Sequence, residues 1–285
     1  MRVSAWFWAW VSIAFGCLAA PVARAGAWLW PENHGLAILT TTFADARKAY
    51  DKSGRLIATP PYRRFETQLY LEHGVTDGLT FVGEATAMDF NGAEDRTVDL
   101  ARSIAQAKVG LPIDGAITPG PHYRGLGLGS AGLRLGVATL GDYVVSVQAS
   151  VRSASSQARR FLDMRQPVTA DARLLVGRSF ALWGMSGFLD GQIGYRSGGQ
   201  NGPETRIDLT AGLRPAANVL LLTQSFSAIA PRGGVAPVMA AQRFQLSAVY
   251  DVTPSLSLQL GGVIAMLGVN SPAERGVFSA LWWRY

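Results

Sequence analysis

Arginines and acidic residues recur at every second position in several stretches of this sequence, where they alternate with apolar residues. The stretch from Arg64 to Glu72 is one example, and the pair Arg206 and Asp208 is another. Side chains two residues apart lie on one face of a β-strand, so these groups would form a shared polar surface. We predict that fifteen side chains line this surface: Arg64, Glu66, Gln68, Glu72, Glu84, Arg134, Gln148, Arg152, Asp171, Arg173, Asp190, Arg206, Asp208, Arg243 and Gln245.

Together with Arg196, this surface carries seven arginines and six carboxylates. In a narrow interior these charges should form pairs, because an unpaired buried charge is costly. Such pairs could simply stiffen the protein, or they could form a polar wall that guides a solute, and the two interpretations are compatible. The near balance of charge argues against a strongly anion-selective or cation-selective passage.

Catalytic chemistry has little support in the sequence. A lipid hydrolase would need a serine, a histidine and an orienting group close together, and no G-x-S-x-G motif marks a nucleophile. The three histidines are His34, His73 and His122, of which only His122, with Ser130 or nearby acids, merits a test. We therefore predict no enzyme, no catalytic residue, no cofactor and no metal site.

The elements that must hold the polar surface are segments with a period of two. Each runs for about ten residues, with polar side chains on one face and apolar side chains on the other. We predict twelve of these segments as strands: Gly35–Ala44, Tyr62–His73, Leu79–Asp89, Leu126–Thr139, Tyr143–Arg152, Ala170–Phe180, Ser186–Arg196, Thr205–Leu213, Val219–Ala228, Gln242–Tyr250, Ser255–Met266 and Gly276–Tyr285.

The connections between these strands alternate between short and long. Short ones, such as Gly141–Asp142, carry the glycine, proline, aspartate or asparagine residues that favour tight reversals. The long ones include Asp45–Pro61. Short turns at one end, long loops at the other and an even strand number are typical of outer-membrane barrels. The sequence therefore predicts an all-β fold, an antiparallel transmembrane β-barrel of about 12 strands, with 10 or 14 as alternatives.

The 36 residues from Phe90 to Gly125 are predicted to form a long external loop that folds over or into the mouth of the barrel. Within this loop, Val98–Lys108 has the pattern of a short amphipathic helix. The same stretch could instead contain another hairpin, which would give the alternative of 14 strands.

The last ten residues form an amphipathic strand that ends on an aromatic residue. Leu281, Trp283 and Tyr285 share one face, and a strand of this length crosses a bilayer at a tilt. The pattern resembles the C-terminal signal read by the machinery that assembles bacterial outer-membrane barrels. It predicts this machinery and periplasmic chaperones as partners during assembly, and membrane lipid around the folded chain. The alternative is the last strand of a soluble β protein.

The first 25 residues have the features of a cleaved secretory signal peptide. Arg2 precedes an apolar run, and Ala23 and Ala25 form an A-x-A cleavage site. Cleavage of 25 of the 285 residues would leave one barrel domain, residues 26–285, and would remove Cys17, the one cysteine of the sequence. A retained anchor helix and a lipoprotein attached at Cys17 are the alternatives. The predicted location is the outer membrane of a Gram-negative cell, after Sec-type export.

Composition excludes other classes of protein. Apolar residues make up 48% of the chain, yet no segment after the signal peptide approaches the ~20 apolar residues of a spanning helix. No dense run of basic residues supports binding to nucleic acid. Eight aromatic residues near turns and termini are predicted to form a girdle at the membrane interface: Trp28, Trp30, Tyr143, Trp183, Tyr250, Trp282, Trp283 and Tyr285.

The stretch Tyr62–Thr80 combines a strand rich in tyrosine and glutamate with the turn sequence Glu72-His73-Gly74-Val75-Thr76-Asp77-Gly78-Leu79-Thr80. Together with Trp28-Leu29-Trp30-Pro31 and Tyr50-Asp51…Gly54, it resembles the phenol meta-pathway (MetA-pathway) transporter-like family of outer-membrane proteins. The resemblance covers the N-terminal third in motif detail and the remainder only in its barrel rhythm. The stretch Gly125–Ser130 departs from the family's pattern. The resemblance implies a barrel that passes small, often hydrophobic or aromatic, compounds.

The sequence thus predicts a non-enzymatic outer-membrane barrel that acts as a passive or ligand-gated conduit for small solutes. A structural or surface-exposed barrel with a filled lumen is the first alternative. An outer-membrane lipid hydrolase is the second.

Overall fold

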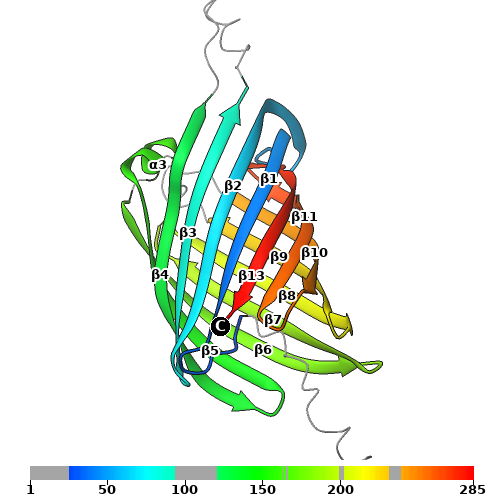
Figure 1. Ribbon diagram of the computed structural model, residues 1–285. Coiled ribbons are helices and arrows are strands. Elements are labelled where there is room, and N and C mark those ends of the chain that lie inside the picture. Colours follow the sequence, from blue (N-terminus) through cyan, green and yellow to red (C-terminus); the bar gives the residue numbers. More distant parts are fainter. Residues whose placement is uncertain (1–25, 94–120, 163, 165, 199–201, 231–238) are drawn as a thin grey trace, which may run out of the picture.

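The computed structural model describes residues 26–93, 121–162, 164, 166–198, 202–230 and 239–285, which form a closed antiparallel β-barrel (Figure 1). Within this part of the chain, twelve long strands make up the wall. Their bounds are β1 Gly35–Tyr50, β2 Leu56–Thr76, β3 Leu79–Gly92, β4 His122–Leu140, β5 Tyr143–Ala154, β6 Val168–Leu182, β7 Met185–Arg196, β8 Glu204–Ala216, β9 Val219–Ala230, β10 Met239–Asp251, β11 Leu256–Val269 and β13 Arg275–Arg284. The two-residue strand β12, Ser271–Pro272, pairs with the end of β1.

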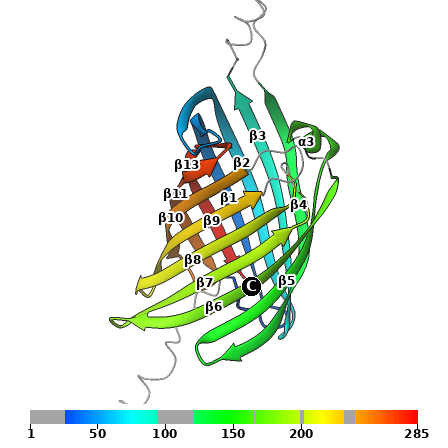
Figure 2. The same ribbon diagram turned by 180° about the vertical axis from the view of Figure 1, so that it is seen from behind.

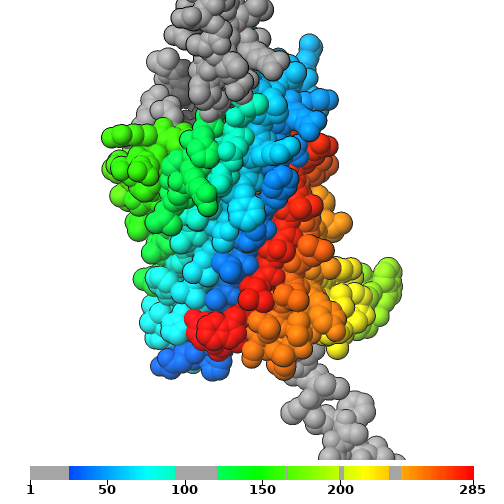
Figure 3. All heavy atoms as spheres, turned by 45° about the horizontal axis from the view of Figure 1, so that its top comes forward, coloured from blue at the N-terminus to red at the C-terminus, as the bar shows by residue number. Residues whose placement is uncertain are grey.

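The first and last strands join to close the wall. β1 pairs with β2 on one side and with β13 on the other, and both pairings are antiparallel. Figure 3 shows β1 and β13 side by side across one face of the barrel, and Figure 2 shows β4 to β8 continuing the wall behind it. Closure lets the backbone N–H and C=O groups of the strands bond to one another, as they must where lipid surrounds them.

All twelve predicted strands are present, and the predicted fold class is confirmed. The predicted loop Asp45–Pro61 is wrong, because β1 continues to Tyr50 and β2 begins at Leu56. The register between β1 and β2 shifts beside Pro60, and proline is tolerated in such an irregular stretch of a strand.

The connection between β3 and β4 is also shorter than the predicted loop Phe90–Gly125, since β3 extends to Gly92 and β4 begins at His122. The predicted helix Val98–Lys108 and the alternative hairpin lie outside the described residues. A different helix, α3 (Ser156–Phe161), was not predicted and follows β5.

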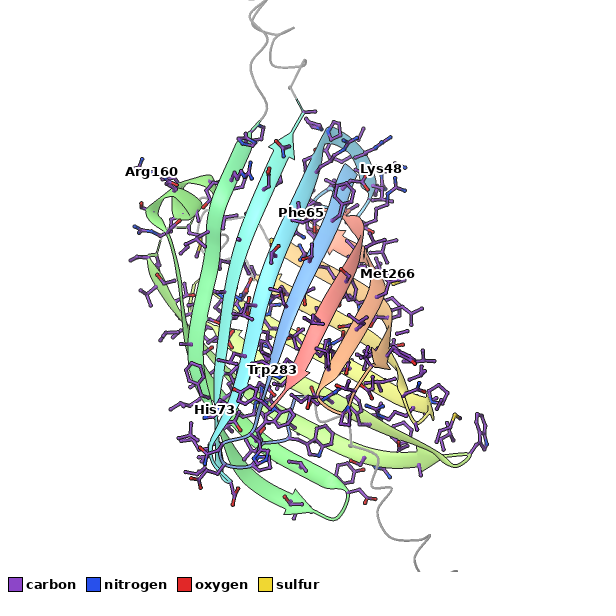
Figure 4. All side chains as sticks on the ribbon, in the orientation of Figure 1. Lys48, Phe65, His73, Arg160, Met266 and Trp283 are labelled. Carbon is purple, nitrogen blue, oxygen red and sulfur yellow. The ribbon has the colours of Figure 1, made fainter. Side chains whose placement is uncertain are left out.

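The two ends of the barrel differ. Short turns at residues 77–78, 141–142, 183–184, 217–218 and 252–255 connect the strands at one end, which we call the turn end. The C-terminus lies there too (Figure 1). The opposite end, called the loop end, carries α3 and the other connections. In Figure 4, His73 and Trp283 mark the turn end, and Lys48 and Arg160 mark the loop end.

The outer face of the wall is apolar over most of its height. Phe65 and Met266 are exposed and point outward in Figure 4, as do other large apolar residues along the strands. The residues between them on each strand are buried or half-buried, and many are polar. An apolar outer band around a polar interior is the arrangement of a barrel that spans a membrane. Among the described residues, no helix is long and apolar enough to cross a membrane.

The two faces of β10 give a direct test of this arrangement. Leu246 is 59% exposed on the outer face, so Leu246→Arg is expected to cost about 2–4 kcal/mol near the middle of the membrane. Its neighbour Gln245 lines an interior cavity, so Gln245→Arg should fold nearly as well as the wild type. Denaturant unfolding in lipid vesicles measures both variants. The reverse order of damage would mean that the register of β10 is shifted by one residue.

Candidate functional site in the barrel interior

All fifteen polar residues predicted to share a surface project from the inner face of the wall. Most of their charges form ion pairs on the same strand or a nearby one: Arg64–Glu66 at 2.6 Å, Arg134–Glu72 at 2.7 Å, Arg152–Glu84 at 3.6 Å, Arg173–Asp171 at 2.7 Å and Arg173–Asp208 at 2.7 Å. Gln148 accepts two hydrogen bonds from Arg134, which ties the amide into the same network. These contacts divide the interior charges into local networks.

Five charged residues of the interior were missed by the sequence reasoning. Glu204 and Glu274 lie at the loop end, and Arg214, Asp251 and Arg284 lie at the turn end. Arg214 and Arg284 both contact the carboxylate of Asp251, at 2.8 and 3.2 Å. Asp251 continues the every-second-residue series that contains Gln245, so extending the pattern to the end of the strand would have found it.

Residues 27–34 precede β1 at the turn end, and we call them the plug segment. Residues 27–30 are buried or half-buried inside the barrel, and residues 31–34 are exposed at its rim. Ala27 is fully buried, and its backbone N–H donates to the carboxylate of Asp190 on β7 at 2.7 Å. On the β2 side, Trp30 Nε1 donates to Glu72 at 2.6 Å. Asp190 therefore binds the backbone of the plug segment, which explains why an inward carboxylate lacks an arginine partner among the described residues.

A layer of apolar side chains crosses the lumen at the level of the plug segment. Leu36 on β1 and Phe188 on β7 belong to one buried cluster, although β7 is the sixth strand from β1 in either direction around the wall. Trp28 of the plug segment packs edge-on against Phe188, with the ring centroids 5.9 Å apart. The other members of the layer are Ile38, Leu220, Leu222, Val249, Ala280, Trp282 and Trp30. This layer packs across the lumen at the turn end.

The wall leaves space for the plug segment at two inward glycines. A Cβ atom on Gly177 would lie 2.6 Å from the ring of Trp28, and one on Gly136 would lie 2.7 Å from Leu29. A side chain at Gly177 would displace the rigid ring of Trp28, and one at Gly136 would displace the end of the Leu29 side chain, so the plug segment packs closely against both glycines.

The predicted aromatic girdle is therefore partly wrong. Trp28, Trp30 and Trp282 lie inside the barrel, where the indole of Trp282 donates to Gln259 at 2.8 Å. The other five residues are exposed on the outside near the turn end, as an interface girdle requires: Tyr143, Trp183, Tyr250, Trp283 and Tyr285. An apolar residue close to a terminus can serve either role, and the sequence pattern does not separate the two.

Leu281 and Trp283 lie on the outer face of β13, and the exposed Tyr285 follows directly after the strand. Tyr285 stacks on His73 of β2, with ring centroids 5.9 Å apart. Their role as the assembly signal stays a prediction.

A cavity of about 400 Å³ opens inside the wall at the loop end. Its polar residues come from the loop ends of β5 to β8 and β10: Arg152, Thr169, Arg196, Glu204, Arg206, Arg243 and Gln245. Its apolar residues come mainly from β9, β10 and the connection after α3: Leu128, Leu162, Met164, Phe226, Ala228, Met239 and Ala241. The cavity lies at the opposite end of the lumen from the apolar layer.

Glu274, between β12 and β13, ties three elements together beside this cavity. Its carboxylate contacts Arg64 at 3.2 Å and Arg243 at 3.1 Å, and it accepts a hydrogen bond from the hydroxyl of Tyr62 at 2.7 Å. Burial alone would raise the pKa of Glu274, but the positive charges of Arg243 and Arg64 and the bond from Tyr62 outweigh it, so its pKa lies below the ordinary value.

This shift predicts a pH dependence. A carboxyl group whose pKa is lowered by folding stabilises the folded state above its unfolded pKa, and that contribution is lost as the pH falls through the folded pKa. Glu274→Gln is therefore expected to lower the melting temperature most at neutral pH, with the difference from the wild type shrinking as the solution is acidified. Melting curves followed by circular dichroism test this. A difference that stays constant down to acid pH would contradict the role given to the charge of Glu274.

A second depression, of about 630 Å³, lies in the wall itself between β3, β4 and β5. Inward residues such as Glu84 and outward residues such as Val151 both line it. It coincides with a β-bulge in which the hydroxyl of Thr86 bonds to both the N–H and the C=O of Leu128. The pairing between β3 and β4 is interrupted at this point.

Among the described residues, His122 and Ser130 do not come together. His122 is exposed at the loop end and contacts Asn91, with Nδ1 and Oδ1 2.7 Å apart. Ser130 lies eight residues further along β4, which corresponds to roughly 25 Å of extended strand. The pair singled out from the sequence is thus too far apart to act together.

Comparison with solved structures finds the same architecture. The COG4313 outer membrane channel from Pseudomonas putida F1 is similar, with a TM-score of 0.64 at 12% sequence identity, over 93% of this chain and 100% of that chain. The NanC porin is similar with a TM-score of 0.50 at 7% identity, over 87% of this chain and 100% of that chain. No family model matches the sequence, and no curated protein matches it. At these identities the likeness establishes a shared barrel fold.

Proposed function

We propose that this chain is an outer-membrane channel for small solutes, closed in the present state by its own N-terminal plug segment. The observation that carries the proposal is the unequal filling of the lumen. The loop end holds a cavity, whereas the turn end is filled by a layer to which Trp28 and Trp30 contribute. These two residues lie before β1, so moving them would break no strand pairing of the wall.

The proposed solutes are small and largely apolar, often aromatic, in keeping with the resemblance to the MetA-pathway transporter-like family. Three features agree with this class. The layer at the turn end is apolar, the cavity has an apolar side, and the depression between β3 and β5 is lined partly by residues of the lipid-facing surface. A solute dissolved in the membrane would meet apolar side chains along this route.

The chain is proposed not to be an enzyme, in line with the separation of His122 from Ser130. Export by a signal peptide cleaved after Ala25, and assembly by the barrel machinery reading Leu281, Trp283 and Tyr285, complete the proposal. Membrane lipid and periplasmic chaperones are the other proposed partners.

A structural barrel with a filled lumen is the second candidate, and the apolar layer is the observation that favours it. Proteoliposomes decide between the two. Uptake of small aromatic solutes faster than in protein-free liposomes is expected for a channel. Uptake equal to that of protein-free liposomes, in the wild type and in variants without the plug residues, would establish the structural role. Release of fatty acid from the liposome phospholipid would instead indicate a hydrolase.

A further inference from the structure

The cavity at the loop end departs from the charge balance of the rest of the lumen. Four arginines line it, Arg152, Arg196, Arg206 and Arg243, but Glu204 is the one carboxylate among its lining residues. The acids that pair with the other arginines, such as Glu84 and Glu274, lie outside the lining. Field lines from clustered cations in a low-dielectric recess favour an anion.

Two of these arginines are weakly held by the protein. Arg206 contacts Glu204 at 3.4 Å, and this carboxylate is already bound closely by Arg196. Arg152 reaches Glu84 only at 3.6 Å. A guanidinium group normally forms shorter hydrogen bonds, of about 2.7–2.9 Å, with a carboxylate that is its main ion-pair partner. Both arginines therefore have bonding capacity left for a ligand.

Three side chains that line the cavity also carry buried donors without a partner. In the described part of the chain, the Nε atoms of Arg196 and Arg206 and the hydroxyl of Thr169 are buried without a hydrogen-bond partner. Thr169 is 2% exposed and Arg196 is 6% exposed. Buried donors are rarely left unpaired, so unpaired donors on the side chains of a cavity favour a ligand that carries oxygen acceptors.

The remaining wall of the cavity is apolar. Phe226 and Ala228 on β9, with Leu162 and Met164 after α3, face the space beside the arginines. A volume of about 400 Å³ lies within the usual range for small-molecule sites, and such sites combine an apolar lining with a few polar groups. A highly hydrated anion such as a sugar acid would leave this wall without a partner.

We propose that the cavity binds small amphiphilic monoanions, with the acid group between Arg152 and Arg206 and the apolar body against Phe226 and its neighbours. This inference deepens the proposed function by naming the substrate class, and it rests on that function only for the later passage of the bound molecule. The acid group would be recognised at the loop end, before the solute meets the apolar layer.

Three molecules of nearly equal size test the proposal: 4-phenylbutyrate, 4-phenylbutanol and 4-phenylbutylamine. Binding to the full chain in lipid nanodiscs is measured by isothermal titration calorimetry, with empty nanodiscs subtracted. The acid is expected to bind at least about tenfold more tightly than the alcohol, and the amine most weakly. Equal binding of acid and alcohol by the wild type would overturn the proposal without any variant being made.

Variants locate the site. Arg206→Gln is expected to weaken the acid at least about tenfold and to leave the alcohol unchanged. Phe226→Ala should weaken the acid and the alcohol alike. Arg178→Gln is the matched control, because Arg178 lies exposed on the outer face of β6. Arg152→Gln repeats the test if Arg206→Gln fails to fold. An equal loss in Arg178→Gln and Arg206→Gln would contradict the site.

Binding and transport are read separately. Tight binding of the acid without any uptake into proteoliposomes would leave the binding site standing and remove the channel function. Uptake of the alcohol with no binding or uptake of the acid would leave the channel function standing and remove the proposed binding site.

Discussion

Replacing Trp28 and Trp30 with alanine is expected to raise the ion conductance of the protein in a planar lipid bilayer. These residues supply the part of the apolar layer that does not belong to the wall. Truncating two large packed side chains should remove about 3 kcal/mol or more from the docked state of the plug segment. A loss of that size raises the undocked fraction by about a hundredfold while this fraction is small.

The control for this experiment is the pair Trp183→Ala and Tyr250→Ala. Trp183 is 86% exposed and Tyr250 is 52% exposed, both on the outer surface. Removing them takes away two aromatic side chains without touching the lumen, so conductance should stay at the level of the wild type. A double variant at Trp28 and Trp30 that folds and still conducts no more than the control would mean that the wall residues alone close the barrel. The structural role would then be favoured over the channel.

The strands could be predicted because the wall separates two environments along its whole height. On β11, for example, Leu258 and Leu260 are exposed on the outer face, whereas Ser257 is fully buried. β11 pairs with β10 on one side and with β13 on the other. One residue faces lipid and the next faces the interior, so the pattern repeats locally in every strand. No long-range information is needed to see it.

The plug segment could not be predicted for the opposite reason. It has no period of its own, and its bonds go to residues far away in the sequence. Ala27 bonds to Asp190, 163 residues away, and Trp30 bonds to Glu72, 42 residues away. Tryptophans near a terminus fit a membrane girdle equally well by composition. What distinguishes them is the space left by wall residues such as Gly177, which depends on the closed barrel.

The charges of the interior are an intermediate case. Their side of the wall followed from the alternation, but their partners did not, because strands such as β2 and β4 pair with β3 rather than with each other. Arg134 on β4 reaches across β3 to Glu72 on β2. Glu274 was hidden for another reason, since it lies in a connection where no alternation applies. The local excess of arginines at the loop end became visible only once these pairs were known.

The pair Glu72 and Arg134 yields the prediction with the largest effect on stability. Their side chains are 3% and 2% exposed, and their atoms Oε1 and Nη1 lie 2.7 Å apart. Glu72 also accepts hydrogen bonds from Tyr70 and Trp30, both at 2.6 Å. Glu72→Gln would leave the charge of Arg134 buried without a counter-charge, and is expected to cost about 3–5 kcal/mol in denaturant unfolding from vesicles.

Two further variants separate the charge from the packing. The double variant Glu72→Gln with Arg134→Gln removes both charges and should be more stable than Glu72→Gln alone, because no unpaired ion remains. Arg275→Gln breaks the outer pair with Asp45, in which the arginine is 67% exposed, and should cost less than about 1 kcal/mol. Because Glu72 also holds Trp30, the single variant should conduct more than Arg275→Gln. Loss of stability without any rise in conductance would show that Glu72 supports the wall alone, and that the plug segment is held through Asp190 and the apolar layer.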